Sequence, residues 1–362
     1  MSKAAELAAL IGSQTALSNR NLIINGAMQV AQRGTSAVTS SGGFPVDRFS
    51  ASYNVTSGAF SSVQSSVTPD NFVSSLKWET TTAASAGTDE VCTFGTKIEG
   101  YDITQFNWGT SAAKKCVVSF QVRSSLTGTY SFAIRNSDAS RSYIAEYTIS
   151  SADTWEQKEI TIPGPTDGTW NSTNGIGMIL NWDLGSGSGR QGTAGSWLSG
   201  TNDFASTNQV NFANTANAAF YITGIQLEVG EQATPFEHRS FADELARCQR
   251  YFAKTADDDN SRCVGHGSHR DSTQFRVIAS VPVTMRIDQP SLVEKSPGSQ
   301  TYRFNGSDGN YNNDGSTAAT LDNGGQPKFT VNVGGFSGLS AGDNGLVKVE
   351  GSGNWLALDA EL

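Results

Sequence analysis

Residues 116–135 read CVVSFQVRSSLTGTYSFAIR, and this stretch decides the fold. Every second residue from Cys116 to Val122 is apolar or a thiol, and these side chains fall on one face of an extended chain. After the turn sequence SLTGT, the same alternation returns at Tyr130, Phe132 and Ile134. A period of two with one apolar face is typical of half-buried antiparallel strands. The stretch therefore predicts two strands that cover a hydrophobic core.

Similar segments extend in both directions, from Asn21 to about Val229. The connections between them are rich in turn formers, as in RNSDAS and DLGSGSGRQG. The composition agrees, because 16% of the residues are charged and 38 are glycine, which suits short strands joined by many turns. Regular strands without intervening helices predict an all-β protein whose residues 19–240 form a jelly-roll β-sandwich.

Two further parts are predicted on either side of this sandwich, since 362 residues are enough for more than one core. Residues 1–18 are expected to form a short helix for particle attachment or trimerisation, with Leu7, Leu10 and Ile11 on its apolar face. A frayed tail is the alternative. Residues 241–362 are expected to contain a linker helix and a smaller C-terminal β domain that forms the tip.

The charge balance argues against nucleic acid as a partner, because 25 basic and 34 acidic residues give a net charge of −9 without a basic cluster. Membrane insertion is not expected, since no stretch has the 18 or so apolar residues that a spanning helix needs. The four cysteines share no metal-type or disulfide-type spacing. Reduced thiols and assembly in a host cytoplasm are predicted, with one or two disulfides left open.

Several blocks resemble a known family in the same order along residues 19–252. They are NRNLIINGAMQVAQRGTS with FPVDRF, TYSFAIRNSDASRSYIAEYTISSADTWEQKEITIPG, GMILNWDLGSGSGRQGTAGSWLSG, and FYITGIQLEVGEQATPFEHRSFADELARCQRYF. The sequence resembles bacteriophage tail-fibre and receptor-binding proteins with a jelly-roll domain like that of carbohydrate-binding modules. The resemblance implies a structural or adhesive unit of the virion, usually a homotrimer, without catalysis.

The function predicted from this resemblance is that of a tail-fibre or tail-tip subunit that attaches the phage particle to the host surface. Its expected partners are other phage tail or virion proteins and a host cell-surface glycan. One alternative is a capsid or baseplate decoration protein without a receptor role. A polysaccharide-degrading tailspike is the other alternative, although no GxSxG, HExxH or phosphate-loop motif supports an enzyme.

Tryptophan side chains are the first candidates for a glycan site. Trp170, Trp182 and Trp197 lie among Gly, Asn and Asp residues, and an aromatic face beside amides and carboxylates suits a sugar ring. A core position is the alternative for Trp182, which lies in the apolar segment MILNWDL. Trp78 and Trp155 are assigned to packing.

A weak metal candidate is the segment CVGHGSHRD, which contains Cys263, His266 and His269 at three-residue spacing. A fourth ligand is missing, so an exposed glycine-rich loop is the alternative and no cofactor is expected. In PFEHRS, the residues Glu237 and Arg239 on either side of His238 are interpreted as a surface charge cluster.

Overall fold

The computed structural model describes residues 19–200, 203–257, 263–295, 301–306, 311–316, 319–325, 328–336, 344–350 and 354–362. The predicted attachment helix with Leu7, Leu10 and Ile11 lies outside these residues. The chain divides into two compact units, of which the first extends to Phe241 and includes Leu362, and the second comprises Ala242–Glu361. Each unit is described by itself.

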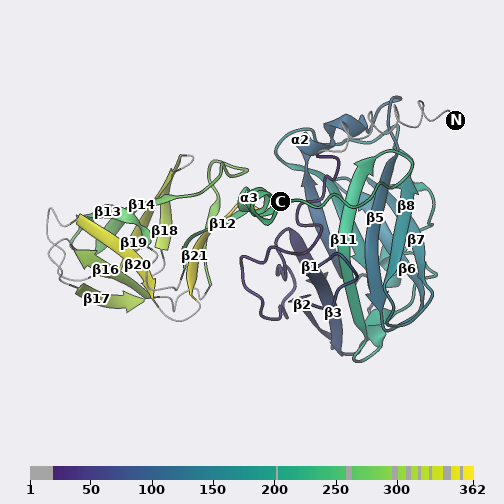
Figure 1. Cartoon of the computed structure of the whole chain (residues 1–362), viewed down its shortest axis with the longest axis horizontal. Coiled ribbons are helices and arrows are strands. Elements are labelled where there is room, and N and C mark those ends of the chain that lie inside the picture. Colours follow the sequence, from purple (N-terminus) through teal and green to yellow (C-terminus); the bar gives the residue numbers. More distant parts are fainter. Residues whose placement is uncertain are drawn as a thin grey trace. The chain divides into compact units, whose positions relative to one another are not determined.

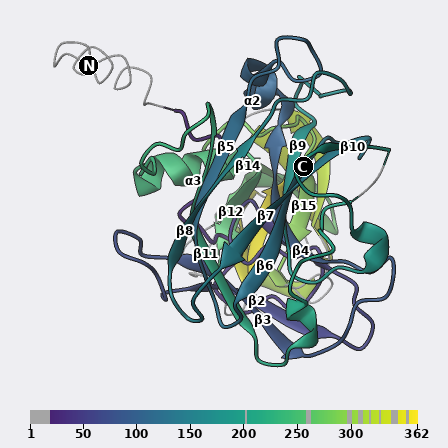
Figure 2. The same ribbon diagram turned by 90° about the vertical axis from the view of Figure 1, so that its right-hand side faces the viewer.

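The first unit consists of two antiparallel sheets. The six-stranded sheet has the order β1 (Phe49–Tyr53), β4 (Cys92–Glu99), β9 (Ile176–Asp183), β6 (Gly128–Arg135), β7 (Arg141–Ile149) and β10 (Trp197–Ser199). The five-stranded sheet has the order β2 (Ala59–Ser65), β3 (Ser75–Thr82), β11 (Ala219–Val229), β5 (Cys116–Ser124) and β8 (Glu156–Ile162). In Figures 1 and 2 the two sheets stack face to face. The predicted all-β sandwich is confirmed.

The core of this sandwich is made by the inward-facing side chains of both sheets. On β5, Phe120 and Val122 are buried, as the alternation predicts. From the other sheet, the indole of Trp182 stacks on the ring of Phe94 with the ring centres 5.5 Å apart and an angle of 4° between the planes. Burying large aromatic side chains of this kind supplies much of the stability of a β-sandwich.

Short helical turns and one irregularity interrupt the strands. The turns are α2 (Gly100–Ile103), η1 (Thr104–Phe106), η2 (Ser188–Arg190) and η3 (Phe212–Asn214). Strand β11 changes its register with β5 between Thr223 and Gln226, and Gly224 in this bulge has φ of +63°. Glycine adopts a positive φ without steric cost, so the sequence TGIQ allows the bulge at this point.

The second unit contains α3 (Phe241–Gln249) from Ala242 onward and two further antiparallel sheets. The three-stranded sheet has the order β12 (Phe252–Asp257), β21 (Trp355–Asp359) and β15 (Ser291–Glu294). The seven-stranded sheet has the order β17 (Tyr311–Ser316), β16 (Thr301–Gly306), β20 (Asn344–Glu350), β13 (Cys263–Asp271), β14 (Gln274–Ser280), β19 (Lys328–Gly334) and β18 (Ala319–Gly325). Phe275, Phe304 and Val331 are among its buried core residues. Within the described ranges, no helix is long and apolar enough to span a bilayer.

Candidate functional site

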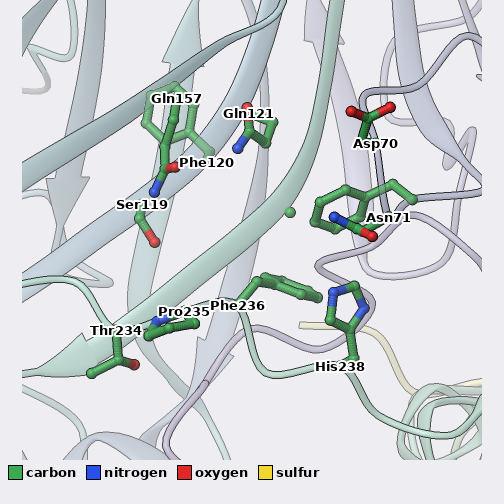
Figure 3. A pocket seen from close by; sticks show the side chains of 12 residues that line it. Asp70, Asn71, Ser119, Phe120, Gln121, Gln157, Thr234, Pro235, Phe236 and His238 are labelled. Carbon is green, nitrogen blue, oxygen red and sulfur yellow. The ribbon is translucent and has the colours of Figure 1, made fainter.

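A pocket of about 470 Å³ opens on the outer face of the five-stranded sheet (Figure 3). Its volume falls in the range of small-molecule binding sites. The pocket is formed by the outward face of β5, β8 and β11 together with two loops, residues 70–72 and residues 234–238.

Polar side chains on two neighbouring strands form one side of the pocket. Gln121 on β5 faces outward because its neighbours Phe120 and Val122 face the core. It lies directly opposite Gln157 on β8, and both glutamines line the pocket. Neither side-chain amide is hydrogen-bonded within the part of the chain that the structure describes. Each therefore offers a carbonyl acceptor and two N–H donors to a ligand.

Three rings form an aromatic wall on another side of the pocket. The ring centre of Phe72 lies 5.1 Å from that of Phe236 and 5.2 Å from that of His238. The rings of Phe236 and His238 are 4.9 Å apart and meet edge to face. Figure 3 shows Phe236 and His238 along the lower side, with the two glutamines above them. The pocket thus combines apolar ring faces with free amide groups.

The loop that carries Phe236 and His238 is held by a buried carboxylate on β11. Glu228 accepts hydrogen bonds from the backbone N–H and the hydroxyl of Thr234, both at 2.8 Å. The side-chain amide of Gln226 donates to Glu228 at 3.0 Å, and its carbonyl oxygen accepts from the backbone N–H of Glu237 at 2.8 Å. These bonds hold the part of the wall that Phe236 and His238 form, which reduces the entropy lost on binding.

Glu237 ties the same loop to the start of the sandwich. Its carboxylate accepts hydrogen bonds from the backbone N–H groups of Asn19 at 2.6 Å and Asn21 at 2.8 Å, and it pairs with Arg239 at 3.3 Å. Burial by itself would raise the pKa of Glu237, but the two N–H groups and the nearby guanidinium lower it below its ordinary value. The interpretation of Glu237 and Arg239 as a surface charge cluster is wrong, because their side chains are only 14% and 6% exposed.

A second aromatic group lies on the same outer face, next to the pocket. Tyr221 on β11 is paired with Arg123 on β5, whose guanidinium lies 5.3 Å from the tyrosine ring centre. The indole of Trp155, which precedes β8, is 6.4 Å from the same ring. Arg123 is two residues from Gln121, or about 7 Å along the strand. Trp155, assigned to packing, lies outside the core clusters and packs against Tyr221 on this outer surface.

Trp182, predicted as a glycan contact, is a core residue. Its side chain is 0% exposed and packs between Phe94 and Phe132. A sugar in solvent cannot reach it, so the prediction is wrong for this residue and the core alternative holds. The apolar run of β9 places it inward.

Trp170 and Trp197 do come together, with ring centres 5.7 Å apart, and both contact Trp108. The indole N–H of Trp170 donates to the carbonyl of Asp167 at 3.3 Å, and that of Trp197 donates to the carbonyl of Pro163 at 2.7 Å. All three indoles pack against the core of the sandwich. The glycan role of Trp170 and Trp197 stays a prediction.

Cys263, His266 and His269 do not form a metal site. They lie in strand β13, not in a loop. His266 is opposite Ile278, which is 52% exposed, whereas His269 is opposite the fully buried Phe275. The two imidazoles therefore project from opposite faces of the sheet. Throughout the described residues, no group of three His, Cys, Asp or Glu side chains is placed to hold a metal ion.

The residues of the pocket were missed in the sequence because they come from distant segments. The alternation in residues 116–122 already turns Gln121 outward. Nothing in the sequence indicates that residues 70–72 and 234–238 meet above it. Phe72 and Phe236 are separated by 164 positions, and only the fold brings their rings together.

No protein-family model and no curated protein matches the sequence. One of the solved structures that are similar to this chain is the enzymatically active domain of tailspike protein 4 of bacteriophage CBA120. The two sequences are 12% identical and the TM-score is 0.31, and the match covers 58% of this chain and 22% of the tailspike chain. The chain thus spans about a fifth of the tailspike chain.

Two other similar structures are matched over nearly their whole length. The family 11 carbohydrate-binding module of a Clostridium thermocellum cellulosomal cellulase has 11% identity and a TM-score of 0.28, with 56% of this chain and 99% of that chain covered. A sugar-binding protein of Bacteroides thetaiotaomicron, described as putative, has 10% identity and a TM-score of 0.32, with 58% and 100% covered. The assignment of the fold rests on the strand order and register given above.

Proposed function

We propose that the first unit is a non-enzymatic carbohydrate-binding module, which holds a glycan in the pocket on the outer face of the five-stranded sheet. The observation that carries the proposal is the aromatic wall of Phe72, Phe236 and His238 facing the free amides of Gln121 and Gln157. A pyranose has an apolar C–H face and a rim of hydroxyl groups, so it matches ring faces on one side and amides on the other.

The finer proposal is that this module serves a bacteriophage tail fibre or tail tip, attaching the particle to a glycan on the host surface. The sequence resemblance over residues 19–252 supports this role. In a homotrimer, three copies of the pocket act together. A weak single site then gains avidity of about 10²-fold or more when the host surface presents several glycans within reach.

Direct binding to saccharides tests the first proposal. The full-length protein is applied to a glycan array, and the best ligands are titrated by calorimetry. Phe236→Ala and Gln121→Ala are each expected to weaken binding by about 5- to 10-fold, since each removes one ring face or one set of hydrogen bonds. Gln105→Ala, at an exposed glutamine outside the pocket, is the matched control. Failure of every saccharide to bind, or equal affinities in all variants, overturns the proposal.

The phage role has a separate test. Labelled antibodies against the chain are imaged on virions, and the purified protein is added to host cells before infection. An attachment subunit is expected on the tail and reduces adsorption as a free protein. Labelling of the capsid without any effect on adsorption favours the decoration alternative. Loss of host polysaccharide during incubation with the purified chain supports the tailspike alternative and contradicts a non-enzymatic role.

A further inference from the structure

We propose that the pocket selects its saccharide by charge, with Asp70 as the specificity-determining residue. Sugars that bear an amine and neutral sugars are accepted, and sugars that bear a carboxylate are disfavoured. This inference rests on the proposed function, since it concerns the same pocket.

The inference rests on the charges of the residues that line the pocket. Asp70 lies in the loop between β2 and β3, and Figure 3 shows it across the pocket from Gln157. Its carboxylate forms no hydrogen bond or ion pair with any residue that the structure describes. Among the described residues that line the pocket, none is a lysine or an arginine. Asp70 therefore contributes a negative charge that no cation of the lining balances.

Cations on the surrounding elements are already paired. Arg239 pairs with Glu237 at 3.3 Å and donates to the carbonyl oxygen of Ile23 at 3.0 Å. Lys158, next to Gln157 on β8, pairs with Glu156 at 2.6 Å. An anionic sugar would have to compete with these carboxylates for a counter-charge.

A second acidic residue lies beside the pocket. Glu159 on β8 is opposite Ser119, which lines the pocket, and its carboxylate accepts a hydrogen bond from the backbone N–H of Ala233 at 2.7 Å. Together with Asp70, it adds negative charge at and beside a pocket whose described lining contains no lysine or arginine. A negative potential attracts an ammonium group and repels a carboxylate or phosphate.

The size of the effect follows from the exposure of Asp70. An exposed unit charge a few ångströms from a ligand charge contributes about 1 kcal/mol in a high-dielectric surrounding, which corresponds to about fivefold in affinity. Such an interaction weakens as the salt concentration rises. The neutral parts of the sugar are recognised by the rings and amides, so neutral sugars keep their affinity.

Two matched series of methyl glycosides test the proposal. Glucosamine, glucose and glucuronate form one series, and galactosamine, galactose and galacturonate the other. The full-length protein is titrated with each by ligand-observed NMR at pH 7, where the sugar amines are mainly protonated and imidazoles are ordinarily mostly neutral. The expected order in at least one series is amine, then neutral sugar, then carboxylate, with about fivefold between successive members at low salt and smaller steps at 0.5 M salt.

The variant Asp70→Asn is expected to bring the three members of a series within about twofold of one another. Asp89→Asn, at an exposed aspartate outside the pocket, keeps the wild-type order. A carboxylate sugar that binds as well as the neutral one, or an order that Asp70→Asn leaves unchanged, overturns the inference alone. Failure of all six glycosides, together with failure of every saccharide on the glycan array, overturns the proposed function as well.

Discussion

The ring of Phe72 occupies the place that a side chain on Gly224 would need. A Cβ added to Gly224 would lie 2.7 Å from Cζ of Phe72, closer than any ordinary contact. Gly224 also has φ of +63° in the bulge of β11. One residue without a side chain therefore bends the strand and lets the aromatic wall approach the sheet.

Gly224→Ala is expected to displace the Phe72 ring and to weaken saccharide binding by about tenfold or more, because the wall loses its support. It should also destabilise the protein by more than the 1–2 kcal/mol that a left-handed conformation costs an L-residue. Gly195→Ala is the matched control, since Gly195 has φ of +85° with nothing within 4 Å of an added Cβ. Urea unfolding and titration measure both effects. Equal losses in the two variants would argue against the steric role of Phe72.

Glu228→Gln is expected to loosen the loop of residues 234–238. The amide that replaces the carboxylate cannot accept all the hydrogen bonds from Thr234 and Gln226. A loss of about 1–3 kcal/mol in unfolding free energy is expected for this buried group. Hydrogen exchange should become faster at residues 234–238, while Glu231→Gln, at an exposed glutamate, leaves it unchanged. Unaltered exchange in Glu228→Gln would contradict the anchoring role.

The lowered pKa of Glu237 predicts a pH-dependent contribution to stability. A carboxyl whose pKa is lower in the folded state stabilises the fold fully above its unfolded value, here near 4.5, and this contribution disappears as the pH falls through the folded pKa. The difference in unfolding free energy between the wild type and Glu237→Gln should therefore be largest near pH 7 and shrink below pH 4.5. Chemical denaturation at several pH values measures it. A difference that grows on acidification has the wrong sign.

Trp155→Ala tests whether the second aromatic group extends the binding surface. Trp155 and Tyr221 lie beside the pocket on the same face, so a longer saccharide can reach them. The variant is expected to weaken oligosaccharide binding by about 5- to 10-fold while sparing monosaccharides. Tyr101→Ala, at a tyrosine that is 59% exposed on α2, serves as the control. Equal losses for short and long ligands would refute the extended surface.

Sequence patterns predicted the sandwich well and the site poorly. Alternation is a local property, so Phe120 and Gln121 could be assigned to opposite faces from the sequence alone. The pocket depends on long-range register, which no local pattern contains. The glycine-rich segment after Trp182 favours an exposed glycan contact and the apolar run MILNWDL favours the core, and the structure shows that its strand turns it inward.

The loop predicted for CVGHGSHRD is wrong for a different physical reason. Its glycines suggested a loop, but a Cβ on Gly267 would lie 1.8 Å from the carbonyl oxygen of Arg276 on the neighbouring strand. Glycine is needed there because two backbones approach closely within a sheet. Glycine content alone does not distinguish a loop from such a strand.

The hydrogen bonds from Asn19 and Asn21 to Glu237 have a mechanical consequence. Arg20 adds a third link, since its guanidinium donates to the carbonyl oxygen of Pro235. A force that pulls on the chain ahead of Asn19 would act on the loop that carries Phe236 before it acts on the hydrogen bonds between the strands of either sheet. Such a force would therefore strain the proposed ligand site before it strains the body of the sandwich.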